Sequence, residues 1–144
     1  MSMYSKFNQL PTEEKEETEH QAAWFEIKSE AQRMALVSPS RNQKTNHVCV
    51  IDNYTNWCGP CKMIAKDFSR LASKYTTTDL TGNTIVFGKE DAEKRIKGAP
   101  EVRGVPTFHF YVNGKNIPNL TVVGADLNEV EQNIQKISQK INRM

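Results

Sequence analysis

The sequence predicts an α/β fold in a single domain, with a sheet that is parallel in its first part and ends in an antiparallel hairpin. Helical and strand patterns alternate from residue 24 onward in the order βαβαβαββα, which is typical of parallel strands joined by helices. The run 47–52 is almost entirely apolar and β-branched, as in strands buried on both faces. Asn113-Gly114 follows a second such run and is a strong hairpin signal.

The first half of this pattern contains two strands and two helices. We expect a strand over 24–28, then a helix over 30–37 that Pro39 ends, since proline cannot continue a helix. The buried strand 47–52 leads to a second helix over 60–75. The apolar residues of this helix recur at helical spacing and are Ile64, Phe68, Leu71 and Tyr75.

The second half predicts the rest of the sheet. A buried strand over 84–87 precedes a short helix over 91–97, which Gly98 and Pro100 end. An aromatic, β-branched strand over 107–112 then begins the hairpin.

The final helix, expected over 127–141, is the clearest element of the pattern. It follows a hairpin partner strand that runs through Val123, and Asp126 with Glu129 supplies a capping box at its start. Its apolar residues step by three and four positions along one face and are Leu127, Val130, Ile134, Ile137 and Ile141.

Composition indicates a globular protein without nucleic-acid or membrane partners. Of 144 residues, 25% are charged and 38% are hydrophobic, which is too apolar for a disordered chain. The net charge is only +2 and the basic residues are scattered, so we expect neither nucleic acid nor an anionic membrane as a partner. Nothing in the composition indicates an oligomer, and we expect a monomer.

Cysteine usage and targeting signals favour a reducing compartment. No stretch has the length of a membrane-spanning helix, and residues 1–20 lack the apolar core and cleavage site of a secretory signal. The three cysteines are an odd number, which argues against a secreted disulfide scaffold. We therefore expect the protein in the cytoplasm or another reducing compartment.

Residues 1–23 differ in kind from the rest of the chain. The stretch 12–20 is polar all round and has no apolar stripe by which a helix could dock. We expect an extension here, either a disordered, solvated arm or an added helix that docks through Trp24 and Phe25 or recruits a partner. The predicted domain then covers residues 24–144.

Two cysteines with two residues between them, Cys58 and Cys61, stand where a strand gives way to a helix. Pro60 in the first turn loses no hydrogen bond, because N–H groups there have no helical partner. The free N–H groups and the dipole of the helix N-terminus favour the thiolate of Cys58, the form that attacks a disulfide. Cys61, one turn deeper, is expected to be more buried and to stay protonated. Cys58 is thus the predicted nucleophile, and Cys61 the thiol that resolves the mixed disulfide.

A carboxylate and a lysine are expected near this pair. Asp52 lies six residues before Cys58 in an otherwise apolar strand, where an ionised group is costly to bury unless it is paired or working. Desolvation would raise the pKa of Asp52 and make it a proton acceptor for Cys61, directly or through a water. Lys89, at the end of the following strand, is placed to offset that rise. The alternative for Asp52 is a strand-end carboxylate turned to solvent.

A proline leads into the aromatic strand. Pro106 has no N–H group and leaves the neighbouring backbone of Val105 unpaired. Such an edge can hold an extended substrate segment by β-type hydrogen bonds. The alternative is a proline that merely starts a strand.

These residues together resemble the thioredoxin family. The pattern consists of WCGPCK at 57–62, Asp52 before it, VPT at 105–107 and Gly124 before the last helix, and the similarity covers about residues 24–141. The resemblance implies a thioredoxin fold, in which helices flank both faces of a central mixed β-sheet. It also implies a flat apolar rim for protein substrates, formed by Trp57, Gly59, Pro60, Val105, Pro106 and Gly124.

The resemblance implies an activity as well, the reduction of protein disulfides. It assigns Cys58 as the nucleophile, Cys61 as the resolving thiol and Asp52 as the buried proton acceptor, and it places Pro106 in cis. In that family a flavin-containing, NADPH-dependent reductase usually reloads the dithiol, so we expect electrons from such a reductase and no bound cofactor. Gly-Pro between the cysteines resembles the reducing members, whereas oxidising isomerases more often have Gly-His.

The chain also departs from the family pattern. Asn53 and Tyr54 follow Asp52 where the family usually has Phe and another aromatic or small residue, and a polar Asn there is expected to alter the pKa of Asp52. The segment 97–101 is expected to form a loop of its own shape, and 76–83 a slightly lengthened loop.

A histidine and a third cysteine raise the alternative of a zinc site. His47 and Cys49 share one side of their strand but lie several residues back from the turn that holds Cys58 and Cys61, so we expect no metal. Cys49 is instead expected to be a buried, unreactive thiol, and His109 a hydrogen-bonded residue without a catalytic role.

Two other functions stay open. One is a binding or structural module whose redox activity is incidental, because a fold alone does not fix function. The intact set Cys58, Cys61 and Asp52 argues against a pure scaffold. The other is a disulfide oxidase or isomerase, which the missing export signal and retention tail disfavour.

Overall fold

The computed structural model describes residues 23–78 and 82–142 of the chain. The predicted extension 1–23 therefore lies outside the described residues, apart from Ala23. Within the described ranges, no helix is both long and apolar enough to cross a membrane.

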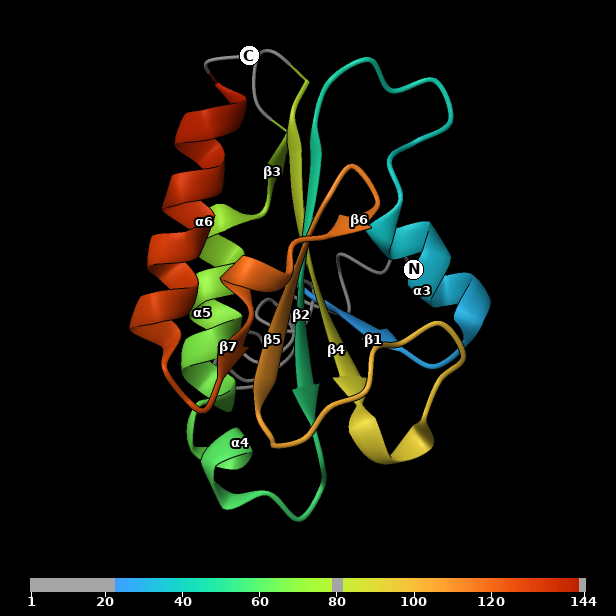
Figure 1. The fold of residues 1–144 in the computed structure, drawn as a ribbon. Helices are drawn as coiled ribbons and strands as arrows, with labels where there is room; N and C mark the ends of the chain where they lie inside the picture. The colour runs from blue at the N-terminus through green and yellow to red at the C-terminus, as the bar shows by residue number, and fades with distance from the viewer. Residues whose placement is uncertain (1–22, 79–81, 143–144) are drawn as a thin grey trace, which may run out of the picture.

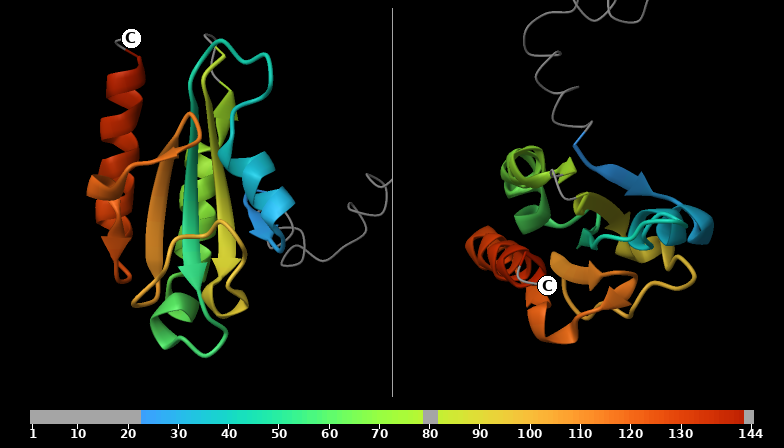
Figure 2. Two further views of the ribbon diagram at one scale, coloured as in Figure 1. Left: turned by 45° about the vertical axis from the view of Figure 1, so that its right-hand side comes forward. Right: turned by 90° about the horizontal axis from the view of Figure 1, so that it is seen from above.

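One mixed sheet lies between two layers of helices, as Figures 1 and 2 show. The helix α3 (Glu30–Val37) covers one face of the sheet. The helices α5 (Ala65–Tyr75) and α6 (Leu127–Ile141) cover the other face. This arrangement confirms the predicted α/β class and the helices on both faces, and the bounds predicted for α3 and α6 are those of the structure.

The sheet is parallel on one side and antiparallel on the other, as predicted. Its main order is β1-β4-β2-β5-β6, in which β1, β4 and β2 run parallel and β5 runs antiparallel to β2. Short strands extend both sides, since β3 pairs with β4 and β7 pairs with β5. The strands are β1 (Phe25–Ile27), β2 (His47–Tyr54), β3 (Thr77–Thr78), β4 (Thr84–Asp91), β5 (Thr107–Val112), β6 (Lys115–Asn116) and β7 (Val122–Val123).

The central strand β2 is buried on both faces, which confirms the interpretation of its apolar run. Val48 and Val50 belong to the larger core cluster, which includes Phe68 of α5. Cys49 and Ile51, at alternate positions, belong to a smaller cluster on the side of α3. The alternation of β2 therefore decides which side chain meets which helical layer.

The helix predicted over 60–75 is in fact two helices, α4 (Gly59–Met63) and α5. They are separated at Ile64, whose φ of −95° and ψ of −1° depart from regular helical values. A one-residue interruption leaves the apolar spacing of the segment almost unchanged, so periodicity does not reveal it.

Two segments after α5 also differ from expectation. The segment 76–83 contains the short strand β3 where only a loop was expected, and 79–81 lie outside the described residues. The strand β4 continues past its predicted end to Asp91, because its last residues pair with β1 on one side and β2 on the other. The short helix that was predicted to follow is a single 3-10 turn, η1 (Ala92–Lys94), which ends at Arg95 with a left-handed φ of 45°.

The hairpin partner of β5 is interrupted. Asn113-Gly114 makes the predicted turn, but the returning chain pairs only as β6 and, after a 3-10 turn η2 (Pro118–Leu120), as β7. Proline has no N–H to donate to a ladder, which explains the gap between the two short strands.

Candidate active site

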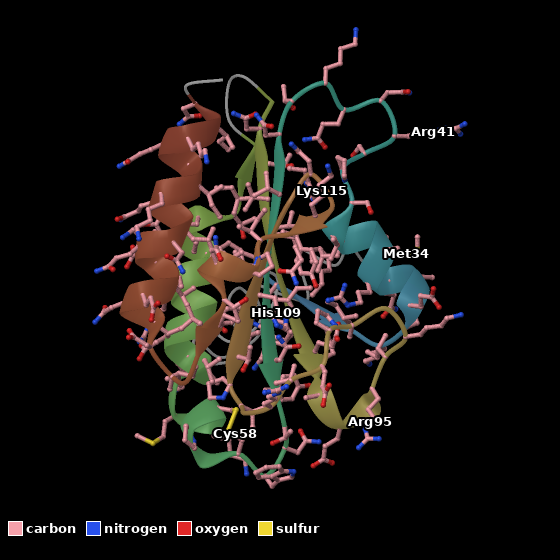
Figure 3. All side chains as sticks on the ribbon, viewed as in Figure 1. Met34, Arg41, Cys58, Arg95, His109 and Lys115 are labelled. Atoms are coloured by element: carbon pink, nitrogen blue, oxygen red, sulfur yellow. A yellow bond between two sulfur atoms is a disulfide. The ribbon has the colours of Figure 1, made fainter. Side chains whose placement is uncertain are left out.

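Cys58 and Cys61 form a disulfide at the end of the sheet where β2 passes into α4, as Figure 3 shows. Their Cα atoms are 5.3 Å apart, within the range usual for a disulfide. Cys58 is the N-cap residue of α4, and its Sγ accepts a hydrogen bond of 3.1 Å from the backbone N–H of Cys61. The local geometry therefore directs a backbone donor at the sulfur of Cys58.

The two cysteines are almost equally buried, contrary to expectation. Cys58 is 3% exposed and Cys61 is 5% exposed. The carbonyl oxygen of Val105 lies 3.7 Å from the Sγ of Cys58 and covers it from the far side of the site. In the disulfide form the sulfur of Cys61 covers it as well, so the depth of the two residues does not separate their roles.

The predicted rim residues surround this disulfide in part. Trp57 is 69% exposed, and Gly59 and Pro60 are exposed beside it. The Val105–Pro106 peptide bond is cis, and Pro106 is buried.

The chain just beyond β7 is held beside Pro106 by a backbone hydrogen bond. Gly124 has a φ of +106° and donates its N–H to the carbonyl of Pro106 at 2.8 Å. Val123 beside it is 70% exposed. Val105 is half-buried, and no residue in the described part of the chain accepts a hydrogen bond from its N–H.

The indole N–H of Trp57 donates to the carboxylate of Glu93, in the turn η1. Sequence reasoning did not find Glu93, and no sequence signal marks it, because it is an ordinary exposed acidic residue. The contact ties the exposed ring to the end of β4.

Asp52 is buried near the end of β2, with an exposure of 1%. Burial raises the pKa of its carboxyl group to about 7, the positive charge of Lys89 opposes this rise, and the charge of Glu26 adds to it. Its Oδ1 has no hydrogen-bond partner among the described residues. The structure thus has Asp52 turned inward, and the alternative of a solvent-facing carboxylate is wrong.

Lys89 lies directly opposite Asp52 in the pairing of β4 with β2. Its Nζ is 4.8 Å from the centre of the Tyr54 ring and 5.1 Å from the centre of the Trp24 ring. The cation is therefore held between two aromatic faces, on the same side of the sheet as Asp52.

Asn53 does not act on Asp52 as expected, because it projects from the opposite face of β2. Its Nδ2 donates to the carbonyl of Thr107 at 2.8 Å and lies 3.0 Å from His109 Nδ1. His109 is buried, and this contact confirms that it is a hydrogen-bonded residue of the sheet.

Cys49 and His47 also have structural positions away from the disulfide. Cys49 is fully buried and burial raises its pKa, which confirms the interpretation as an unreactive thiol. The His47 ring contacts Thr84 Oγ1 and the carbonyl of Leu36 at the other end of β2. Among residues 23–78 and 82–142, no three His, Cys, Asp or Glu side chains gather as a metal site would require.

A cavity of about 580 Å³ opens beside the disulfide, between the end of β4 and the loop before Pro106. Trp57 and Val105 form its wall next to the sulfurs. Its lining includes four buried polar side chains, which are Asn53, Thr55, Glu90 and Asp91. Within the described chain, the hydroxyl of Thr55 has no hydrogen-bond partner.

Sequence reasoning missed this polar lining. Glu90 is paired with the buried Arg33 at 3.2 Å, and Arg33 also donates to the Tyr111 hydroxyl at 2.6 Å. No local signal marks Glu90, because it stands between Lys89 and Asp91 in a charged stretch that resembles an exposed strand end. The predicted loop 97–101 contributes Ala99, Pro100 and Glu101 to the same cavity.

Comparison with known proteins agrees with this geometry. Residues 39–136 match the profile of the family described as Thioredoxin. Thioredoxin from Coprinus comatus is 35% identical over 99 residues, which are 66% of this chain and 87% of that protein. Thioredoxin-like protein 1 of Schizosaccharomyces pombe is 40% identical over 92 residues, 62% of this chain but only 29% of that relative.

The fold is also that of solved thioredoxins. The oxidised form of mitochondrial thioredoxin 3 from Saccharomyces cerevisiae has a TM-score of 0.63 and 26% identity, over 81% of this chain and 98% of that one. The family profile spans well over half of the chain, and the disulfide Cys58–Cys61 occupies the turn between β2 and α4. The chain therefore belongs to the thioredoxin family of thiol–disulfide oxidoreductases.

Proposed function

We propose that this protein reduces disulfide bonds in other proteins, with Cys58 as the attacking sulfur and Cys61 as the resolving one. The observation that carries the proposal is the disulfide at the start of α4, in which Cys61 N–H donates to Cys58 Sγ. A donor aimed at a sulfur stabilises the negative charge of the thiolate. The same donor serves the reduced protein, in which Cys58 is then more acidic than an ordinary cysteine.

The reaction proceeds in two exchanges. The Cys58 thiolate attacks one sulfur of the substrate disulfide, forms a mixed disulfide and releases the first substrate thiolate. The sulfur of Cys61 then attacks Cys58 Sγ, which releases the second substrate thiolate and leaves the Cys58–Cys61 disulfide. The substrate gains two electrons, which this chain loses.

Asp52 is the proposed acceptor of the Cys61 proton in the second exchange. A carboxyl group whose pKa is raised to about 7 accepts and releases a proton near neutral pH, where a general base is most effective. Lys89, in register beside it, limits the cost of the charged form.

The rim supplies the proposed substrate surface. Val105 offers an unpaired N–H to an extended segment, since no described residue accepts from it. Exposed apolar groups stand around the sulfurs and are Trp57, Pro60 and Val123. Gly59 and Gly124 leave room for a polypeptide to approach.

Reloading the dithiol requires two electrons and two protons from outside the chain. A flavin-containing, NADPH-dependent reductase of the kind that serves this family is the proposed donor, and this chain itself needs no bound cofactor for thiol exchange. Such a cycle suits a monomer in the cytoplasm or another reducing compartment, where the third thiol, Cys49, stays buried and unpaired.

Cys61→Ser is expected to trap substrates on Cys58. Without the resolving sulfur, the mixed disulfide has no intramolecular route to release, so it accumulates with a disulfide-bonded test protein. Non-reducing electrophoresis and mass measurement of the complex check this outcome. The matched variant is Cys58→Ser, which is expected to trap nothing; trapping by that variant alone would reverse the assigned roles.

The reduction potential of the couple separates a reductase from an oxidase. We expect a value near the roughly −270 mV of thioredoxins, measured by equilibration against glutathione buffers. A value close to the roughly −120 mV of a strong oxidant would instead support the oxidase function.

A further inference from the structure

Three charged residues form a row across neighbouring strands at the end of the sheet that carries the disulfide. Glu26 of β1 pairs in register with Lys89 of β4, and Lys89 pairs with Asp52 of β2. Because these strands are parallel, side chains at paired positions project from the same face of the sheet. The row therefore places one lysine between two carboxyl groups.

Lys89 is confined to the middle of this row by aromatic rings. Its Nζ lies above the rings of Tyr54 and Trp24, at 4.8 Å and 5.1 Å from their centres. Trp24 is itself fixed, because its indole N–H donates to Ser69 Oγ of α5 at 3.0 Å. Across residues 23–78 and 82–142, Lys89 makes no close ion pair with either carboxyl group. The positive charge of Lys89 thus acts on both Glu26 and Asp52 and is not neutralised by a direct ion pair with either of them.

The two carboxyl groups differ in their access to solvent. Asp52 is fully buried, whereas Glu26 is half-buried on β1, the edge strand of the sheet. The hydroxyl of Tyr54 donates to Glu26 Oε1 at 2.7 Å and fixes that carboxyl group beside the lysine. Tyr54 therefore contacts both Glu26 and Lys89.

We propose that Glu26 is a positioning residue of the dithiol reaction. Its carboxylate attracts the positive charge of Lys89, so that less of this charge stabilises ionised Asp52 and Asp52 accepts a proton more readily. This inference rests on the proposed role of Asp52 as the acceptor for Cys61. Glu26 acts through Lys89 and through its own charge, and contacts neither the sulfurs nor the substrate.

The charged groups around the row shift the pKa of Asp52 in the directions that this proposal requires. The negative charge of Glu26 raises the pKa of Asp52, and the positive charge of Lys89 lowers it. Burial raises the pKa of Glu26 as well. The other groups that act on the pKa of Glu26 are Lys89, Lys94 and the Tyr54 hydroxyl, which lower it, and Asp91, which raises it.

The test uses the oxidised protein, in which the disulfide removes both cysteine titrations from the site. Glu26→Gln keeps an oxygen that accepts from Tyr54 but removes the charge. We expect the proton affinity of Asp52, followed by carboxyl carbon chemical shifts in NMR, to weaken about three to ten times, so that the Asp52 pKa falls below about 7. Glu101→Gln removes an equal charge from an exposed loop position and is expected to leave the titration unchanged.

Repeating the change in a Lys89→Met background tests whether the lysine is shared. With Lys89 present, removal of Glu26 frees its charge for Asp52, so the shift is expected to be larger than in the Lys89→Met background. An equal shift in both backgrounds would overturn the sharing of Lys89, and no shift in either would overturn the inference as a whole.

Kinetic measurements distinguish the role of Glu26 from the proposed role of Asp52 as the proton acceptor for Cys61. In the reduced protein, Glu26→Gln is expected to move the pH profile of mixed-disulfide resolution to lower pH by the same amount as the Asp52 titration. If the titration moves while the resolution profile stays, the row is real but Asp52 is not the proton acceptor. If neither moves, the positioning role of Glu26 is wrong.

Discussion

Cys58→Ser is expected to slow the reduction of a protein disulfide by at least about 1000-fold, to the rate of the added dithiol alone. The reaction needs a sulfur anion at the position that Cys61 N–H faces, and a serine hydroxyl stays protonated near neutral pH. The fold should persist, because serine is nearly isosteric with cysteine and still accepts at the N-cap of α4. Turnover of a disulfide-bonded test protein with a small dithiol reductant measures the effect.

Cys49→Ala is the control for this experiment. It removes the third thiol, which is buried on the side of the sheet that faces α3, and it leaves the disulfide site intact. We expect full turnover from this variant. Normal turnover by Cys58→Ser would contradict the proposed chemistry and would leave the fold as a binding module.

Asp52→Asn is expected to stabilise the oxidised protein by roughly 4 kcal/mol above pH 7, and hardly at all below pH 4. The ordinary pKa of the carboxyl group is 3.8, and burial raises it to about 7 in the folded protein. Between these values the native state binds a proton that the unfolded chain releases, so stability is full below the lower pKa and is lost as the pH rises to the higher one. The neutral amide avoids this loss.

Denaturant unfolding of the oxidised proteins across this pH range measures the difference. Asp67→Asn is a suitable control, because Asp67 is exposed and its one ion pair among the described residues is with the equally exposed Arg70, at 2.8 Å. Its effect should stay below about 1 kcal/mol at every pH. Equal unfolding free energies for Asp52→Asn and the unaltered protein at pH 8 would contradict the raised pKa of Asp52.

Local signals predicted the elements that depend on local structure. The final helix has the predicted bounds because Asp126 accepts from Glu129 N–H at its start and the apolar residues recur every three or four positions. Long-range pairing decided the elements that were predicted less well. The strand β4 runs on to Asp91 because β1 and β2 both pair with its polar end, which no local pattern records.

The residues of the site also fall into those that local sequence reveals and those that only long-range contacts reveal. Cys58, Cys61 and Asp52 were found because each stands out from its immediate neighbours in the chain. Glu26 and Glu93 were not, because each reaches the site only through a distant partner: Glu26 through the pairing of β1 with β4, and Glu93 through the indole of Trp57. Charged residues at a strand edge or in an exposed turn look ordinary until those partners are known.

The interruption at Ile64 divides the segment after β2 into a short helix that carries both cysteines of the disulfide at its start and a longer helix that packs into the core. The five residues of α4 bury a single side chain, and that side chain is Cys61 itself. Apolar packing against the larger core cluster begins at Ile64 itself and continues with the fully buried Phe68 on α5. The chemistry of the sulfur–sulfur bond and the packing of the core are therefore carried largely by two different helices.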